Sequence, residues 1–236
     1  MNRKAVYWNP THDRTGGIVN IERLSTAIRL KTIFRNDSTD NELQPFLDFH
    51  ALLDTSYPFI RKRLEKKVIN TYSLLYKWPG KNPELEPIAF LAHFDVVPVE
   101  PETRQQWRYD PFSGKVADGF VWGRGALDMK GPLMAMMEAV ETLLGEGFQP
   151  ERTVYLALGH DEESGGFNGA GQISLFLKNK GIGFLFTLDE GMAILDRQLS
   201  PIEKPLAAIG IAEKGYLTLK LSAHEEGGHP SVSPFK

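Results

Sequence analysis

Residues 153–191 have the sequence TVYLALGHDEESGGFNGAGQISLFLKNKGIGFLFTLDEG. The apolar run from Thr153 to Leu158 predicts a buried strand, and Ala170 to Asn179 predicts a helix that ends near Gly181. A second strand follows from Phe184 to Leu188. Strand, helix and strand in this order are typical of parallel strands joined by a crossover helix. The stretch therefore predicts an α/β domain with a mostly parallel sheet flanked by helices.

The preceding part of the chain supplies further elements of the same kind. Asn20 is suited to cap a helix, because Ile21, Leu24 and Ile28 fall on one side of it. The other expected elements are a helix from Glu42 to Asp54 with Pro45 in its first turn, strands Thr71–Lys77 and Ile88–Ala92, a strand pair within Val116–Trp122 and a helix over Lys130–Leu144. We interpret the charged run Arg61–Lys67 as solvated surface.

Composition narrows the class of protein. The 236 residues are 42% hydrophobic and 24% charged, with a net charge of -3 and no cysteine. A net charge of -3 leaves no excess of basic residues for binding nucleic acid. The absence of cysteine excludes disulfides and thiolate metal ligands. The longest apolar runs are far shorter than the ~20 residues of a membrane-spanning helix. The N-terminus lacks the apolar core of a secretory signal, so we expect a soluble, cytoplasmic protein without a membrane partner.

Acidic and histidine side chains follow the predicted strands. His93 and Asp95 follow one strand, Glu162 and Glu163 follow another, and Asp189 follows a third. The carboxyl ends of parallel strands meet at one edge of a sheet, where ligands bind. Carboxylates gathered there repel one another unless cations lie among them. A pair of divalent metal ions is the economical candidate, which predicts a metal-dependent hydrolase.

Each of these residues also has an ordinary structural interpretation. An isolated His93 with Asp95 is more often a satisfied strand-end histidine, although Asp95 is placed to orient its ring. Asp128 precedes a helix, so it can be an N-cap, a carboxylate shared by two cations, or both.

The acidic residues after the later strands leave similar alternatives. Glu162 and Glu163 can be a solvated loop, or one can bind metal while the other moves protons. Asp189 is a turn cap or a ligand. One histidine with three carboxylates suits Zn²⁺, and also Mn²⁺ or Co²⁺.

Four motifs in the same order give the chain a resemblance to the M20 family of metallopeptidases, and within it to the carboxypeptidase S-like branch. The resemblance extends from about Leu24 to His229. The motifs are Ala92–Val99, the segment from Trp107 through Gly123–Gly131, Gly159–Glu163 and Leu188–Gly191.

The resemblance implies a role for each candidate residue. His93 binds one zinc ion, with Asp189 as the second ligand of that ion. Asp128 bridges both ions, and Glu163 is a ligand of the other. The implied catalytic residues are Glu162 as the general base, Asp95 as the residue that orients the site, and His229 as the lid histidine that stabilises the tetrahedral intermediate.

The resemblance also implies a domain organisation. Residues 1–212 correspond to the N-terminal portion of a zinc-peptidase-like catalytic domain, and residues 213–236 to the beginning of an α+β lid domain. Members often dimerise through this lid, so a homodimer is expected of the full-length protein. The last catalytic strands and the final metal-binding histidine of the family have no counterpart here, so the C-terminal part of the fold is missing.

We therefore expect a hydrolase of peptide or N-acyl amino-acid amide bonds, of carboxypeptidase or aminoacylase type, that uses a water activated by two zinc ions. One alternative is a truncated, catalytically inactive fragment of such an enzyme. Another is an aminopeptidase-type two-zinc enzyme, which would require a free amine on its substrate.

Overall fold

The computed structural model describes residues 20–35, 42–191, 195, 204–212, 215, 217 and 219–222. The chain separates into two units, Met1–Glu190 and Gly191–Lys236. In the second unit, Leu195 and Leu206 pair through an antiparallel bridge. The predicted domain boundary between residues 212 and 213 falls inside this unit and stays a prediction. Most of the predicted lid segment lies outside the described residues.

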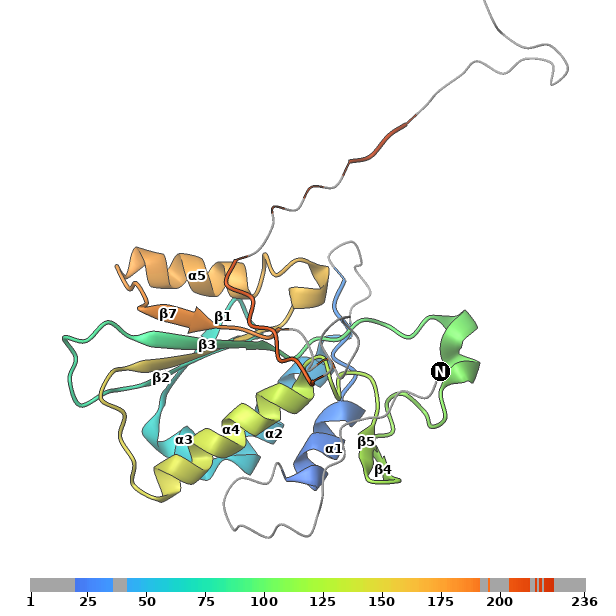
Figure 1. Ribbon diagram of the computed structural model, residues 1–236, viewed down its shortest axis with the longest axis horizontal. Coiled ribbons are helices and arrows are strands. Elements are labelled where there is room, and N and C mark those ends of the chain that lie inside the picture. Colours follow the sequence, from blue (N-terminus) through green and yellow to red (C-terminus); the bar gives the residue numbers. More distant parts are fainter. Residues whose placement is uncertain are drawn as a thin grey trace, which may run out of the picture. The chain divides into compact units, whose positions relative to one another are not determined.

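A five-stranded sheet with the order β1-β2-β6-β3-β7 forms the centre of the first unit (Figure 1). Its strands are β1 (Glu65–Ile69), β2 (Ser73–Trp78), β3 (Ile88–His93), β6 (Val154–Gly159) and β7 (Phe186–Leu188). β3 runs parallel to both β6 and β7, whereas β2 is antiparallel to β1 and β6. All strands except β2 therefore point the same way, which confirms the predicted mostly parallel sheet.

Four helices cover one face of this sheet. They are α1 (Ile21–Arg29), α2 (Gln44–Ser56), α3 (Pro58–Arg63) and α4 (Lys130–Gly145). The predicted helix over Lys130–Leu144 corresponds to α4, and its side chains Leu133 and Met137 are fully inaccessible. They pack in one core cluster with Leu156 and Leu158 of β6. This burial favours a fixed position for α4, whose first turn follows Asp128.

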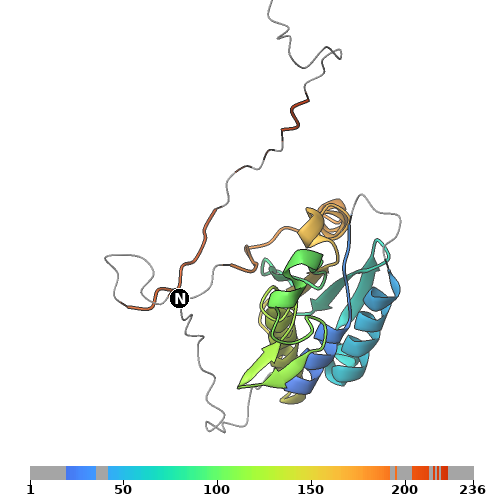
Figure 2. The same cartoon turned by 90° about the vertical axis from the view of Figure 1, so that its right-hand side faces the viewer.

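The opposite face of the sheet is covered by α5 (Ala170–Asn179), as Figure 2 shows. Ile173 and Leu177 of α5 pack against Tyr155 and Ala157 of β6. Successive β6 residues thus enter different cores, as the two-residue period of a strand requires. β6 is buried along its whole length, so it reads as a continuous apolar run in the sequence.

Local sequence signals account for several boundaries. The Asn20 side chain accepts hydrogen bonds from the backbone N–H groups of Glu22 and Arg23, at 3.1 and 3.2 Å, and so caps α1 as predicted. Strands β4 (Lys115–Ala117) and β5 (Phe120–Trp122) form the predicted pair. Their turn residues Asp118 and Gly119 both have positive φ, which tight hairpin turns demand.

The charged run Arg61–Lys67 contains structure that the sequence did not predict. It holds the end of α3 and the beginning of β1. Most of its side chains are exposed, in agreement with the predicted solvated surface. β1 is an edge strand, and edge strands accept charged residues because one side faces water. The apolar alternation that normally marks a strand is therefore absent.

The alternation of apolar and polar residues from Tyr216 to Leu221 favours a strand, but this stretch lies partly outside the described residues. Those of its residues that are described have no regular secondary structure. Among the described helices, none combines the length and the apolar character needed to cross a bilayer. The expected cytoplasmic location and the homodimer through the lid stay predictions.

Candidate metal centre

The carboxyl ends of β3 and β6 bring two of the predicted motifs together. β3 ends at His93, which lies opposite Gly159 at the end of β6 in parallel register. The backbone N–H of Phe94 donates to the Gly159 carbonyl at 3.1 Å, which extends the pairing past the strand end. The segments after both strands therefore leave the sheet side by side. This is the edge at which parallel α/β sheets bind ligands.

His93 is buried, and Asp95 faces the first of its ring nitrogens. Nδ1 of His93 lies 3.2 Å from Oδ1 of Asp95 and 3.1 Å from the Asp95 carbonyl oxygen. A group that accepts a hydrogen bond at Nδ1 leaves Nε2 available to a ligand and fixes the plane of the ring. Asp95 is itself fully buried.

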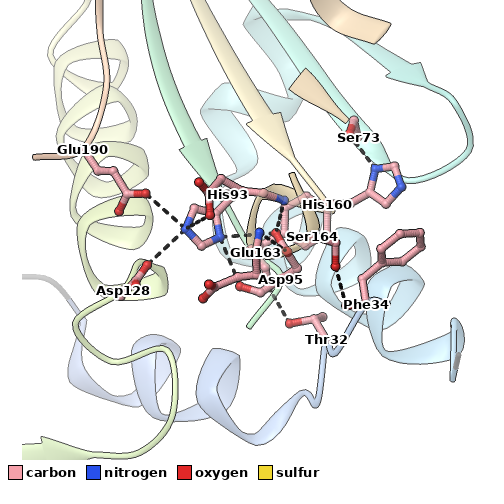
Figure 3. Close-up of polar contacts among 12 residues, drawn as sticks. Thr32, Phe34, Ser73, His93, Asp95, Asp128, His160, Glu163, Ser164 and Glu190 are labelled. Atoms are coloured by element: carbon pink, nitrogen blue, oxygen red, sulfur yellow. Dashed lines mark hydrogen bonds and ion pairs between the residues drawn. The ribbon is translucent and has the colours of Figure 1, made fainter. Parts of the chain in front are cut away.

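The second ring nitrogen of His93 points into a group of carboxylates (Figure 3). Nε2 lies 3.1 Å from Oδ1 of Asp128, 3.4 Å from Oε1 of Glu190 and 3.7 Å from Oε2 of Glu162. One ligand atom from each of His93, Asp128 and Glu190 lies within 4.8 Å of the other two. These three residues come from β3, the loop before α4 and the segment after β7. Segments distant in sequence thus converge at one point.

Glycines shape the loop that carries Asp128. Gly125 has a φ of +84°, and a Cβ atom there would lie 2.7 Å from Cγ1 of Val96. The loop can therefore approach the His93–Val96 segment only without a side chain at position 125. The Lys130 N–H donates to the Gly125 carbonyl at 2.9 Å and closes the loop into α4. Asp128 is 64% exposed, so its position depends on this backbone.

The Asp95 carboxylate also fixes the turn that carries Glu162 and Glu163. This turn is the short helix η2 (Glu162–Ser164). The backbone N–H groups of Glu162 and Glu163 donate to Oδ1 and Oδ2 of Asp95 at 3.1 and 3.0 Å. These two hydrogen bonds satisfy both oxygens of a carboxylate that is out of contact with water. One carboxylate therefore holds both the His93 ring and the two glutamates in place.

The electrostatics of the cluster favour added positive charge. Burial alone lowers the pKa of His93, but the hydrogen bond and charge of Asp95, with the charges of Glu190 and Glu162, raise it to about 9. Burial is also the main cause that raises the pKa values of Glu162, Glu163 and Glu190. Neighbouring carboxylates, Asp128 among them, raise these values further. The group thus holds more negative charge than one imidazolium balances.

Most of the sequence-predicted residues come together in this cluster. Mutual charge interactions shift the pKa values of His93, Glu162 and Glu163. Asp95 and Asp128 are among the charges that cause these shifts. Asp189 is exposed, and its Oδ1 accepts a hydrogen bond from the Glu190 N–H at 2.8 Å. Its role as a ligand stays a prediction. His229 lies outside the described residues.

Glu190 is the residue that the sequence interpretation missed. Asp189 was preferred because it directly follows the apolar strand. Leu188 lines a cavity with Met136 of α4, and both Asp189 and Glu190 line the same cavity. The strand period therefore does not separate the two carboxylates, and the sequence holds no local signal for Glu190.

His160 and Asp161 do not join the cluster, although they lie in the same acidic motif. Nδ1 of His160 lies 2.7 Å from Oγ of Ser73, and burial lowers the pKa of this imidazole. Oδ2 of Asp161 accepts a hydrogen bond from the Asn168 N–H at 2.7 Å. Both side chains are buried, and their contacts with Ser73 and Asn168 stabilise the loop after β6.

Comparison with known proteins assigns the family. Residues 89–229, more than half of the chain, match the model described as "Peptidase family M20/M25/M40". The chain belongs to peptidase family M20. This M20 chain is 44% identical over 215 residues to the probable carboxypeptidase S-like 2 protein of Dictyostelium discoideum, with 89% of the chain and 41% of that protein covered.

Two further relatives represent different described activities. The M20 chain is 38% identical to carboxypeptidase S of Saccharomyces cerevisiae, with 94% of the chain and 40% of that protein covered. It is also 38% identical to the N-fatty-acyl-amino acid synthase/hydrolase PM20D1 of Xenopus tropicalis, with 91% and 41% covered. The chain thus spans about two fifths of the length of these relatives.

Solved structures agree with the fold of the M20 chain. Human carnosine dipeptidase 1 matches 74% of the chain, and 38% of its own chain is covered, with a TM-score of 0.56 and 16% identity. The M20 family metallo-carboxypeptidase Sso-CP2 of Sulfolobus solfataricus matches 73%, with 38% of its own chain covered, a TM-score of 0.54 and 20% identity. At these identities, the likeness concerns the fold alone.

Proposed function

We propose that the side chains around Nε2 of His93 bind a divalent cation. An imidazole nitrogen and carboxylate oxygens are ligands that Zn²⁺, Mn²⁺ and Co²⁺ accept. The donor atoms of His93, Asp128 and Glu190 already lie close to one another. Burial is the main cause of the raised pKa values of Glu162, Glu163 and Glu190, and neighbouring carboxylates add to the rise. A cation in place of the Nε2 proton of His93 would balance the charge of these carboxylates better.

We propose that the protein is a metal-dependent hydrolase of peptide or N-acyl amino-acid amide bonds. The observation that carries this proposal is the convergence of one imidazole and several carboxylates at the ligand-binding edge of an M20-family sheet. The substrate class is supported by the names of two relatives, a carboxypeptidase S and an N-fatty-acyl-amino acid synthase/hydrolase.

Two zinc ions are part of the proposal. His93, Asp128 and Glu190 would hold one ion, and Glu163 and Asp128 would hold the other. Glu190 here takes the role that the sequence suggested for Asp189, because its carboxylate is the one near Nε2 of His93. When bound, such ions lower the pKa of water and polarise a carbonyl group.

Glu162 is the proposed general base. Its Oε2 lies 3.7 Å from Nε2 of His93, and the side chain is 52% exposed, so it faces both the cluster and solvent. Burial and nearby carboxylates raise its pKa, which makes the carboxylate a better proton acceptor. Glu162 takes a proton from water as the water oxygen bonds to the amide carbon. It then gives that proton to the amine nitrogen as the C–N bond breaks.

The substitution Glu162→Gln tests this role. Glutamine keeps the size of the side chain but accepts no proton, so turnover of an N-acyl amino acid should fall by about 10²–10⁴-fold. The metal content, measured by elemental analysis, should not change, because Glu162 is not a proposed ligand. Glu65→Gln on β1 is the matched control and should leave turnover unchanged.

Three results would contradict parts of the proposal. Turnover retained by Glu162→Gln would exclude Glu162 as the general base. A wild-type protein that binds metal but hydrolyses neither peptides nor N-acyl amino acids would favour the alternative of a catalytically inactive member. Faster cleavage of substrates with a free amine than of their N-acyl counterparts would favour the aminopeptidase alternative.

A further inference from the structure

The segment after α1 contacts two loops of the candidate metal centre, the loop after β3 and the loop after β6. The Thr32 hydroxyl donates to the carbonyl of Phe94, and the Val96 N–H donates to the Thr32 carbonyl at 2.9 Å. Further along the segment, the Phe34 carbonyl accepts from the Ser164 hydroxyl at 2.9 Å. Figure 3 shows Thr32, Phe34 and Ser164 near His93, with the hydrogen bond from Ser164 to Phe34 as a dashed line. The position of residues 30–34 therefore affects the loops after β3 and after β6.

Lys130 fixes the beginning of this segment. Its Nζ donates to the carbonyl oxygens of Ala27 and Leu30, at 3.0 and 2.6 Å. Both carbonyls belong to the C-terminal end of α1, which attracts cations. The Lys130 side chain is fully buried, and its Nζ lies 5.7 Å from the centre of the Phe49 ring. A buried amino group is costly unless it is hydrogen-bonded, so this contact is specific.

The same residue also closes the loop of Asp128. The Lys130 backbone N–H donates to the Gly125 carbonyl at 2.9 Å. A Cβ atom at Gly125 would lie 3.3 Å from Cδ of the Lys130 side chain and 2.7 Å from Val96. Lys130 therefore packs against the Asp128 loop with its side chain as well as with its backbone. One residue joins this loop to the end of α1.

We propose that Lys130 is a positioning residue for the candidate metal centre. Its Nζ fixes residues 30–34 relative to the Asp128 loop, and those residues fix the loop that follows His93 and the loop that carries Glu163. The exposed Asp128 carboxylate is thereby held next to Nε2 of His93. This inference rests on the proposed function, because the geometry it preserves is that of the metal ligands.

A second contact between α1 and α4 provides a matched control. Nη1 of Arg23 lies 3.0 Å from Oε2 of Glu138 on α4. This ion pair joins the same two helices as Lys130 does, but it involves the first turn of α1. It does not contact the loops after β3 and β6 or the loop of Asp128. Arg23→Met therefore weakens the packing of α1 on α4 without a direct effect on the ligands.

The test compares Co²⁺ binding to Lys130→Met, Arg23→Met and wild type. Co²⁺ is the probe because its visible absorption reports the coordination geometry as well as binding. Loss of a supporting contact behind metal ligands typically weakens metal binding by about 10–100-fold, and we expect this range for Lys130→Met together with a changed spectrum. Arg23→Met should lower the melting temperature but keep the wild-type Co²⁺ affinity and spectrum.

Each outcome decides the inference. Wild-type Co²⁺ affinity and spectrum in folded Lys130→Met would overturn it, as would equal losses of affinity in Lys130→Met and Arg23→Met. If Lys130→Met does not fold, Thr32→Val removes the next contact in the same path, and unchanged Co²⁺ binding in that variant would overturn the inference. A wild-type protein that binds no Co²⁺ would contradict the proposed function itself.

Discussion

Asp95 connects three parts of the candidate centre through one buried carboxylate. It faces Nδ1 of His93 and accepts hydrogen bonds from the backbone of Glu162 and Glu163. The sequence predicted its contact with His93, because alternate residues of an extended strand share a side. Its hydrogen bonds with the backbone of Glu162 and Glu163 could not be predicted, since they depend on the register between β3 and β6.

Glu190 and Asp189 can be distinguished by metal binding. Glu190→Gln should weaken the binding of Zn²⁺ by more than about tenfold, because it replaces a charged ligand next to His93 by a neutral amide. Asp189→Asn should have a smaller effect, because its carboxylate caps the following N–H. Isothermal titration calorimetry with Zn²⁺ measures the affinity of both variants. A larger loss of affinity in Asp189→Asn than in Glu190→Gln would identify Asp189 as the ligand.

Metal affinity should also depend on pH through His93. The charges around this imidazole raise its pKa to about 9. A cation at Nε2 must replace the proton, so raising the pH removes the competitor and strengthens binding. The apparent association constant for Co²⁺ should rise about tenfold per unit between roughly pH 6 and pH 8. A constant affinity over this range would show that no proton leaves His93 on binding.

Helix α4 positions the centre through its first turn. Most helices could be predicted because caps and apolar periodicity are local: the predicted helix from Ala170 to Asn179 agrees with α5 at both ends. The segment α3 was missed, since its six residues are too short to show a periodic pattern. The close approach of the Asp128 loop to α4 was also unpredictable, because it depends on contacts between distant atoms.

Gly131 in this first turn should not tolerate a side chain. A Cβ atom there would lie 2.2 Å from the carbonyl oxygen of Ala126, so the Asp128 loop would have to shift. Gly131→Ala should destabilise the protein by about 1–3 kcal/mol and weaken Co²⁺ binding.

Gly145→Ala at the other end of α4 is the control for this prediction. Its Cβ would meet only the Phe59 ring, at 3.2 Å, and a ring can turn aside. Because alanine favours helix by up to about 1 kcal/mol over glycine, this variant should be neutral or stabilising. Thermal unfolding and Co²⁺ titration measure both effects. Tight Co²⁺ binding by Gly131→Ala would show that the loop adapts.

The central strand of the sheet, β6, packs against both hydrophobic cores of the first unit. β6 separates the two cores of the first unit, with Leu156 in one and Tyr155 in the other. The fold class could be predicted from the apolar runs, but the strand order could not. β1 was missed because its charged residues suit an edge, and the antiparallel insertion of β2 has no local signal.

Leu156→Ala should destabilise the whole unit. The side chain is fully buried in the larger core, so its loss should cost about 2–5 kcal/mol. Leu175→Ala on α5, where the leucine is 50% exposed, should change stability by less than about 0.5 kcal/mol. Urea unfolding measures both variants. Similar midpoints for the two would show that the core rearranges around position 156.

The antiparallel pairing of β2 with β6 joins Leu74 to Leu158, and β6 also separates β2 from β3. On the ribosome, these earlier strands emerge well before their common neighbour exists. The apolar faces of β2 and β3 therefore lack their common neighbour until residue 159 has left the exit tunnel. A pause in translation between β3 and β6 prolongs this exposure, during which unpaired strand edges are prone to aggregate.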